Sequence, residues 1–102
     1  MNTVSRFRKQ LERFRGVCEK AGRDPASIAV ALRVLGGPGA KPRASIDGEA
    51  EMFTGGDADW VGDIGELKQL GVAAVDVRLF RRSASDTIDA MRQFRDGVLA
   101  RL

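Results

Sequence analysis

The sequence predicts a small α/β protein with two to three parallel strands covered by about three helices. Two apolar segments, residues 28–35 and 72–80, have the length and the side-chain alternation of strands. Amphipathic segments with helical spacing precede, separate and follow them, and glycines mark the boundaries between segments. Helices alternating with strands favour a parallel sheet, and so few elements leave one side of that sheet uncovered.

Length and composition limit the function classes. The 102 residues suit one domain, 1–102, and 43% hydrophobic with 30% charged residues is ordinary for a folded, water-soluble protein. No apolar run approaches the roughly 20 residues of a membrane span, so we expect a cytoplasmic protein with no membrane partner. The absence of histidine excludes imidazole catalysis, and with one cysteine we expect neither a disulfide nor a metal site.

Positive charge is concentrated near the N-terminus. Residues 1–23 contain seven basic and two acidic side chains, a net charge of +5, so the remainder carries −2. Such a segment can bind nucleic acid or another polyanion. The arginines, however, lie between apolar positions with no interleaved aromatic residue for base stacking. We therefore interpret them as the solvated face of a helix and do not expect nucleic acid as a partner.

The first helix is predicted over residues 3–21. Thr3 or Ser5 can cap its start and Gly22 its end, and Cys18 is expected to be buried. Its apolar positions alternate in steps of three and four: Val4, Phe7, Leu11, Phe14, Cys18 and Ala21.

The first strand follows a turn at Asp24-Pro25. Between residues 28 and 35, bulky aliphatic side chains point one way, and Ala29, Ala31 and Arg33 point the other way. The next segment, 36–42, is a glycine- and proline-rich loop. It contains a lysine but lacks the GxxxxGK[ST] order of a phosphate-binding loop.

A short strand over residues 50–54, a Gly55-Gly56 turn and a second helix come next. Asp57 is the expected N-cap, and Gly71 ends the helix. The predicted buried stripe consists of Trp60, Val61, Ile64, Leu67 and Leu70.

The second long strand, within 72–80, repeats the division of the first. Val75, Val77 and Leu79 share one face, while Ala74, Asp76 and Arg78 share the other, so Asp76 can pair with Arg33 in a common sheet. Ser83 and Asp86 then start a terminal helix. Its predicted apolar stripe is Ile88, Met91, Phe94, Val98 and Leu102.

Two motifs carry a family resemblance. Residues 21–28 (AGRDPASI) lead into a strand, and Phe53-Thr54-Gly55-Gly56-Asp57 opens a helix that ends LKQLGV and feeds the next strand. In this order they resemble the closing part of bacterial luciferase-like monooxygenases, flavin- or deazaflavin-dependent TIM-barrel oxidoreductases. The resemblance spans nearly the whole chain but only the last third of that barrel. It implies a partial (β/α) barrel.

The resemblance also implies a site at the carboxyl ends of the strands. Cofactor-binding residues would be Thr54, Gly55, Gly56, Arg81 and Arg82, with FMN or deazaflavin as the cofactor. The strands that form the ring pocket of such enzymes have no counterpart here, so we expect no catalytic residues and no activity of the chain alone. Expected partners are a barrel-completing segment or further copies in a homo-oligomer. The alternative is a small self-associating or polyanion-binding module that uses the basic N-terminal helix.

Overall fold

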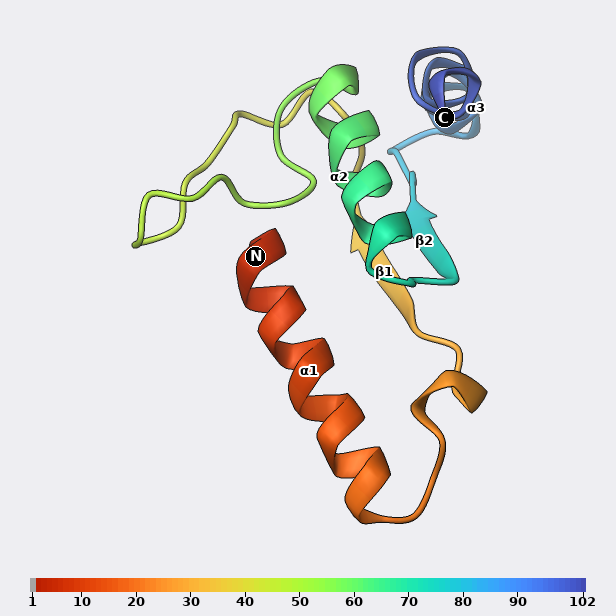
Figure 1. Ribbon diagram of the computed structural model, residues 1–102. Coiled ribbons are helices and arrows are strands. Elements are labelled where there is room, and N and C mark those ends of the chain that lie inside the picture. Colours follow the sequence, from red (N-terminus) through yellow and green to blue (C-terminus); the bar gives the residue numbers. More distant parts are fainter. Residues whose placement is uncertain (1) are drawn as a thin grey trace.

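A computed structural model describes residues 2–102 and confirms the α/β class. Helix α1 (Val4–Lys20) leads through a 3-10 turn, η1 (Pro25–Ser27), into strand β1 (Ala31–Leu35). A long connection reaches helix α2 (Asp57–Gln69), followed by strand β2 (Ala74–Arg78), helix α3 (Ala84–Gly97) and a 3-10 turn, η2 (Leu99–Arg101). Figure 1 shows α2 lying across the two strands, with α3 displaced to the end of β2.

The sheet of the described residues has two parallel strands, β1 and β2. Arg33 lies opposite Asp76 and Val34 opposite Val77. The predicted strand at 50–54 is wrong, because this segment makes only isolated antiparallel bridges, Ala44 with Ala50 and Thr3 with Glu51. It folds back on its own loop and on the start of α1 instead of joining the sheet.

Both strands are shorter than predicted. Ile28 caps the 3-10 turn that Pro25 initiates, so the first strand starts at Ala31 and not at residue 28. Pairing with the second strand nevertheless begins slightly earlier, since the Ala73 amide donates to the Val30 carbonyl at 2.9 Å. Past Arg78, β2 ends.

Helix boundaries follow local capping chemistry. Thr3 and Ser83 are the N-caps of α1 and α3, and their hydroxyl oxygens accept from the Arg6 and Asp86 amides, as predicted. The prediction for α2 is wrong: Gly56 is the N-cap and Asp57 the first helical residue. Asp59 reaches back to the Gly56 amide at 2.9 Å, which leaves no capping role for Asp57.

The core lies between α2 and one face of the sheet. Trp60 is fully buried there, and its ring packs edge-on against Phe53 and Phe94 with centroids 4.9 and 5.8 Å away. From the sheet, the bulky face predicted by the alternation packs against this core: Leu32, Val34, Val75, Val77 and Leu79. The predicted burial of Cys18 is also confirmed, on α1 outside this cluster.

Helix α3 only partly joins the core. Phe94 and Val98 are buried, but Ile88, Met91 and Leu102 are 47%, 56% and 60% exposed, so the prediction of a continuous buried stripe is wrong. In Figure 1, α3 lies beside the end of β2 and not across the strands, as α2 does.

The molecule exposes more surface than a compact chain of its size. Its surface area is 7108 Å², against about 5,600 Å² expected for a compact monomer. Its radius of gyration is 15.4 Å, against about 13 Å expected. The excess surface includes the second face of the sheet.

Candidate functional site

The second face of the sheet is open to solvent. Every residue that points to this side from the two strands is exposed: Ala31, Arg33, Leu35, Ala74, Asp76 and Arg78. We call this set the open face. Leu35 is 65% exposed, and Phe80, just past the strand end, is 71% exposed. Apart from Leu35, the division into a bulky covered face and a small, charged open face is the one that the sequence alternation predicts.

Charged side chains at the centre of the open face interact with each other. The Arg33 Nε donates to the Asp76 Oδ2 at 3.2 Å, which confirms the predicted pair. The Arg78 guanidinium lies 5.1 Å from the centre of the Phe80 ring, within cation–π range. Together with Met91 of α3 these side chains line a groove of about 610 Å³ at the carboxyl end of β2.

The loop after β1 and the turn before α2 are joined by hydrogen bonds near the carboxyl end of the sheet. The Gly36 amide donates to the Arg78 carbonyl at 3.0 Å, so the hydrogen bonds between the two strands continue to the carboxyl ends of both. Further along, Gly39 and Ala40 exchange backbone hydrogen bonds with Gly55, both at 2.8 Å. The turn before α2 is therefore fastened to the loop after β1.

The predicted cofactor residues Thr54, Gly55 and Gly56 lie together in this turn, but their polar groups have protein partners. The Thr54 hydroxyl donates to the Glu51 carbonyl and accepts from the Arg43 amide. The amides of Gly55 and Gly56 donate to the Ala40 carbonyl and to the Asp59 carboxylate. An anion at this turn would have to displace these bonds.

Arg81 and Arg82, the other predicted cofactor residues, are exposed at the end of β2. Arg81 leans toward the loop after β1, because a Cβ built on Gly37 would lie 3.4 Å from its Nη2. Its amide donates to the Thr87 hydroxyl at 3.0 Å. The Arg81 guanidinium thus lies beside the loop after β1, and among the described residues no hydrogen bond joins Arg81 or Arg82 to the 54–56 turn.

Two carboxyl groups near this region have shifted pKa values. Burial raises the pKa of Asp63, whose Oδ2 accepts from the Phe53 amide at 2.8 Å. Phe53 itself has a φ of 60°, a left-handed conformation uncommon for an aromatic residue. Hydrogen bonds from the hydroxyl and amide of Ser5 lower the pKa of Glu49, which fastens the long loop to α1.

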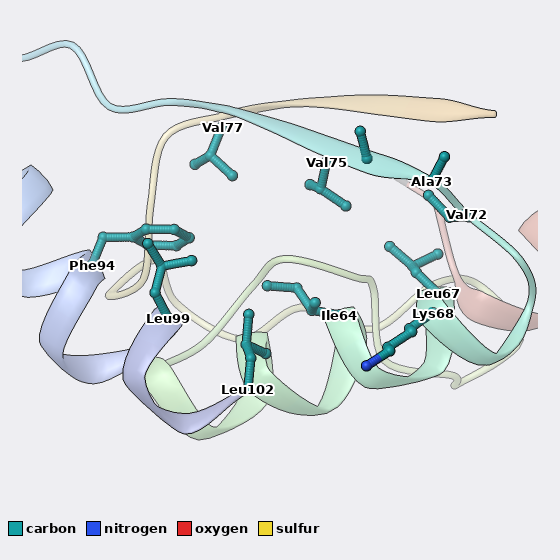
Figure 2. A pocket seen from close by; sticks show the side chains of 11 residues that line it. Ile64, Leu67, Lys68, Val72, Ala73, Val75, Val77, Phe94, Leu99 and Leu102 are labelled. Atoms are coloured by element: carbon teal, nitrogen blue, oxygen red, sulfur yellow. The ribbon is translucent and has the colours of Figure 1, made fainter. Parts of the chain in front are cut away.

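A second hollow, the apolar cavity, lies on the covered side of the sheet. It has a volume of about 380 Å³ and opens between α2, β2 and the C-terminal turn. Figure 2 shows Val75 and Val77 pointing down into it from the strand, with Ile64 and Leu67 rising from α2. The other residues that border it are Lys68, Val72, Ala73, Phe94, Leu99 and Leu102, together with Ala74, whose side chain belongs to the open face.

Sequence reasoning did not find this cavity. The helical spacing predicts that Val98 and Leu102 are buried on the same face of the terminal helix. In the structure, the helix gives way to η2 after Val98. Val98 is buried, but Leu99 and Leu102 stay partly exposed at the side of the cavity. The one signal was the pair of apolar residues, Val98 and Leu99, directly after Gly97. Adjacent residues point about 100° apart on a helix, so Leu99 faces a different direction from Val98.

Within residues 2–102, no cluster of three or more histidine, cysteine or acidic side chains has the geometry to hold a metal ion. Over the same residues, none of the helices combines the length and apolarity that crossing a bilayer requires.

Comparisons with known proteins give no match: no protein-family model, no curated protein and no solved structure is significantly similar to this chain.

Proposed function

We propose that this chain is a barrel-forming segment of a luciferase-like flavin- or deazaflavin-dependent oxidoreductase, inactive until further strands cover its open face. The observation that carries the proposal is a parallel βαβ unit whose second face, lined by alanine and charge, is exposed. Parallel sheets are otherwise almost always covered on both faces. One resembling motif, residues 21–28, precedes this unit, and the other, residues 53–72, contains its helix.

The amount of exposed surface supports a covering partner. The excess over a compact monomer is about 1,500 Å², more than the roughly 800 Å² that each partner buries in a stable interface. Both strands also have a free edge, because the sheet of residues 2–102 ends at β1 on one side and β2 on the other. Further strands would pair there, from a barrel-completing segment or, for the purified chain, from a second copy.

The cofactor assignment explains why the chain alone should be inactive. When bound, a flavin or deazaflavin would supply hydride transfer. Arg81 and Arg82 offer cations for its phosphate, but the amides of Gly55 and Gly56 are occupied. The groove beside Arg78 and Phe80 is open to solvent and does not enclose a ring system. The residues present therefore fit the phosphate only in part.

The test has two measurements on the purified chain. Titration with FMN and with a deazaflavin should show no tight one-to-one binding, and tight binding with turnover would contradict the dependence on further strands. Sedimentation velocity over a hundredfold range of concentration should show association. Ala31→Glu, on the open face at the start of β1, should abolish it, whereas Ala58→Glu, exposed on α2, should not. A monomer at all concentrations would contradict the proposal that a second copy covers this face.

A second candidate function, polyanion binding by α1, rests on the exposure of its basic side chains. Two of these already have protein partners: Arg6 contacts the Ser45 hydroxyl, and Arg15 donates to the Leu70 carbonyl at 2.9 Å. If α1 binds polyanions, affinity for heparin or RNA should fall steeply with salt and with Arg8→Gln. Absence of binding at low salt would dismiss this candidate.

A further inference from the structure

The apolar cavity between α2, β2 and the C-terminal turn has the dimensions of a small-molecule site. Its volume of about 380 Å³ lies within the range of ligand pockets. Such a space holds on the order of a dozen water-sized groups. It lies on the covered side of the sheet, away from Arg33 and Asp76 of the open face.

Water is a poor occupant of this cavity. Every residue that borders it except Lys68 is aliphatic or aromatic. An ordered water needs two to four polar partners, which such walls do not provide. Leu99 and Leu102 are 52% and 60% exposed on the wall, so an apolar chain entering here would remove their surface from water.

Lys68 is the one charged side chain in the lining. It lies in the last turn of α2, and within residues 2–102 no hydrogen bond or ion pair engages its ammonium group. Figure 2 shows its side chain beside Leu67 with the nitrogen directed away from the strand. A lysine stem can border an apolar space while its charge stays in water. The cavity thus has an apolar interior and one cation at its rim.

We infer that this cavity binds an amphipathic carboxylate, with the hydrocarbon chain between α2 and β2 and the carboxylate at the Lys68 ammonium. The charge selects an anionic head group, and the walls select an apolar tail. This inference goes beyond the proposed oxidoreductase function and does not depend on it, because it uses other residues on the other side of the sheet.

Titration of the full chain with decanoate, below its micelle concentration, tests the inference. Calorimetry should give one site per chain, and octanoate should bind about tenfold more weakly because two methylene groups are lost. Decyltrimethylammonium, with the same tail and opposite charge, should bind at least threefold more weakly than decanoate. Amide chemical-shift changes should map to Lys68, Val72 and Leu99.

Lys68→Met should remove the preference for decanoate over the cationic probe, while Lys20→Met, in the last turn of α1, should retain it. Val75→Phe, which places a ring in the cavity, should weaken both ligands tenfold or more in a chain whose circular dichroism is unchanged. Equal affinity for the two head groups, no effect of Lys68→Met, or shifts confined to the open face would each overturn the inference. The inference would also be overturned if decanoate dissociated an oligomer equally well with and without Lys68. That result would mean that a second copy of the chain occupies the cavity.

Discussion

The two faces of the same two-stranded sheet have opposite environments. Val34 is 3% exposed on the face that α2 covers, whereas Leu35, the next residue, is 65% exposed on the open face. On the covered face, the rings of Phe53 and Phe94 and several aliphatic side chains pack around Trp60. On the open face, alanines and an arginine–aspartate pair contact solvent.

The difference between these faces separates what holds the chain together from what it offers to a partner. Stability comes from the covered face, since burial of large apolar side chains is the dominant favourable term in folding. The open face adds little to the stability of the isolated chain, because an exposed ion pair is screened by water. Its residues are therefore free to serve assembly.

The largest effect is expected at the centre of the covered face. Trp60→Ala should lower the free energy of unfolding by about 3–5 kcal/mol, because it leaves a cavity among Phe53, Leu67 and Phe94. Trp60→Phe should cost clearly less, since it keeps a ring and removes an indole N–H that has no acceptor within residues 2–102. Urea unfolding measures both. Equal losses would show that the rings do not form the core described here.

The next largest loss of stability is expected at the helix N-caps, where a buried cap can be compared with an exposed one. The Thr3 side chain is fully buried, whereas Ser83 is exposed. Thr3→Ala should cost about 1–2 kcal/mol and Ser83→Ala about 0.5–1 kcal/mol in urea unfolding. The reverse order would place α3, rather than α1, in the stable part of the molecule.

A pH-dependent effect is expected at Asp63, beside the covered face. Its pKa is raised in the folded state, mainly by burial, so its contribution to stability is fully present below the unfolded pKa and is lost as pH rises through the folded pKa. Asp63→Asn keeps an acceptor for the Phe53 amide and removes the charge. The variant should therefore match the parent near pH 3.5 and exceed its stability at pH 7, by less than about 1 kcal/mol. Urea unfolding at both pH values checks the sign, and a less stable variant at pH 7 would contradict it.

The smallest effect is expected on the open face. A double-mutant cycle with Arg33→Ala and Asp76→Ala should give a coupling of about 0.2–0.5 kcal/mol in the dilute chain, as for other exposed pairs. At concentrations where the chain associates, the coupling should increase, because covering the face removes the pair from water. An unchanged coupling in the associated state would place the interface elsewhere.

Much of this arrangement is readable from local sequence. The alternation at Ile28–Leu35 and Val75–Leu79 predicts which side chains face the core, and Thr3 and Ser83 mark where two helices begin. The pairing of Arg33 with Asp76 follows once both strands share a parallel sheet. The candidate site is predicted less well: Thr54, Gly55 and Gly56 are brought together, but the partners that occupy their polar groups come from residues 40, 43, 51 and 59.

By itself, the sequence determined the elements, their order and the two unlike faces of the strands, because periodicity and capping act over a few neighbouring residues. Only the tertiary structure decided that residues 50–54 bridge to a loop and to α1, that α3 lies beyond the sheet, and that η2 opens an apolar cavity beside Lys68. These outcomes depend on contacts between residues distant in the chain, whose energies are set by packing and desolvation rather than by local pattern.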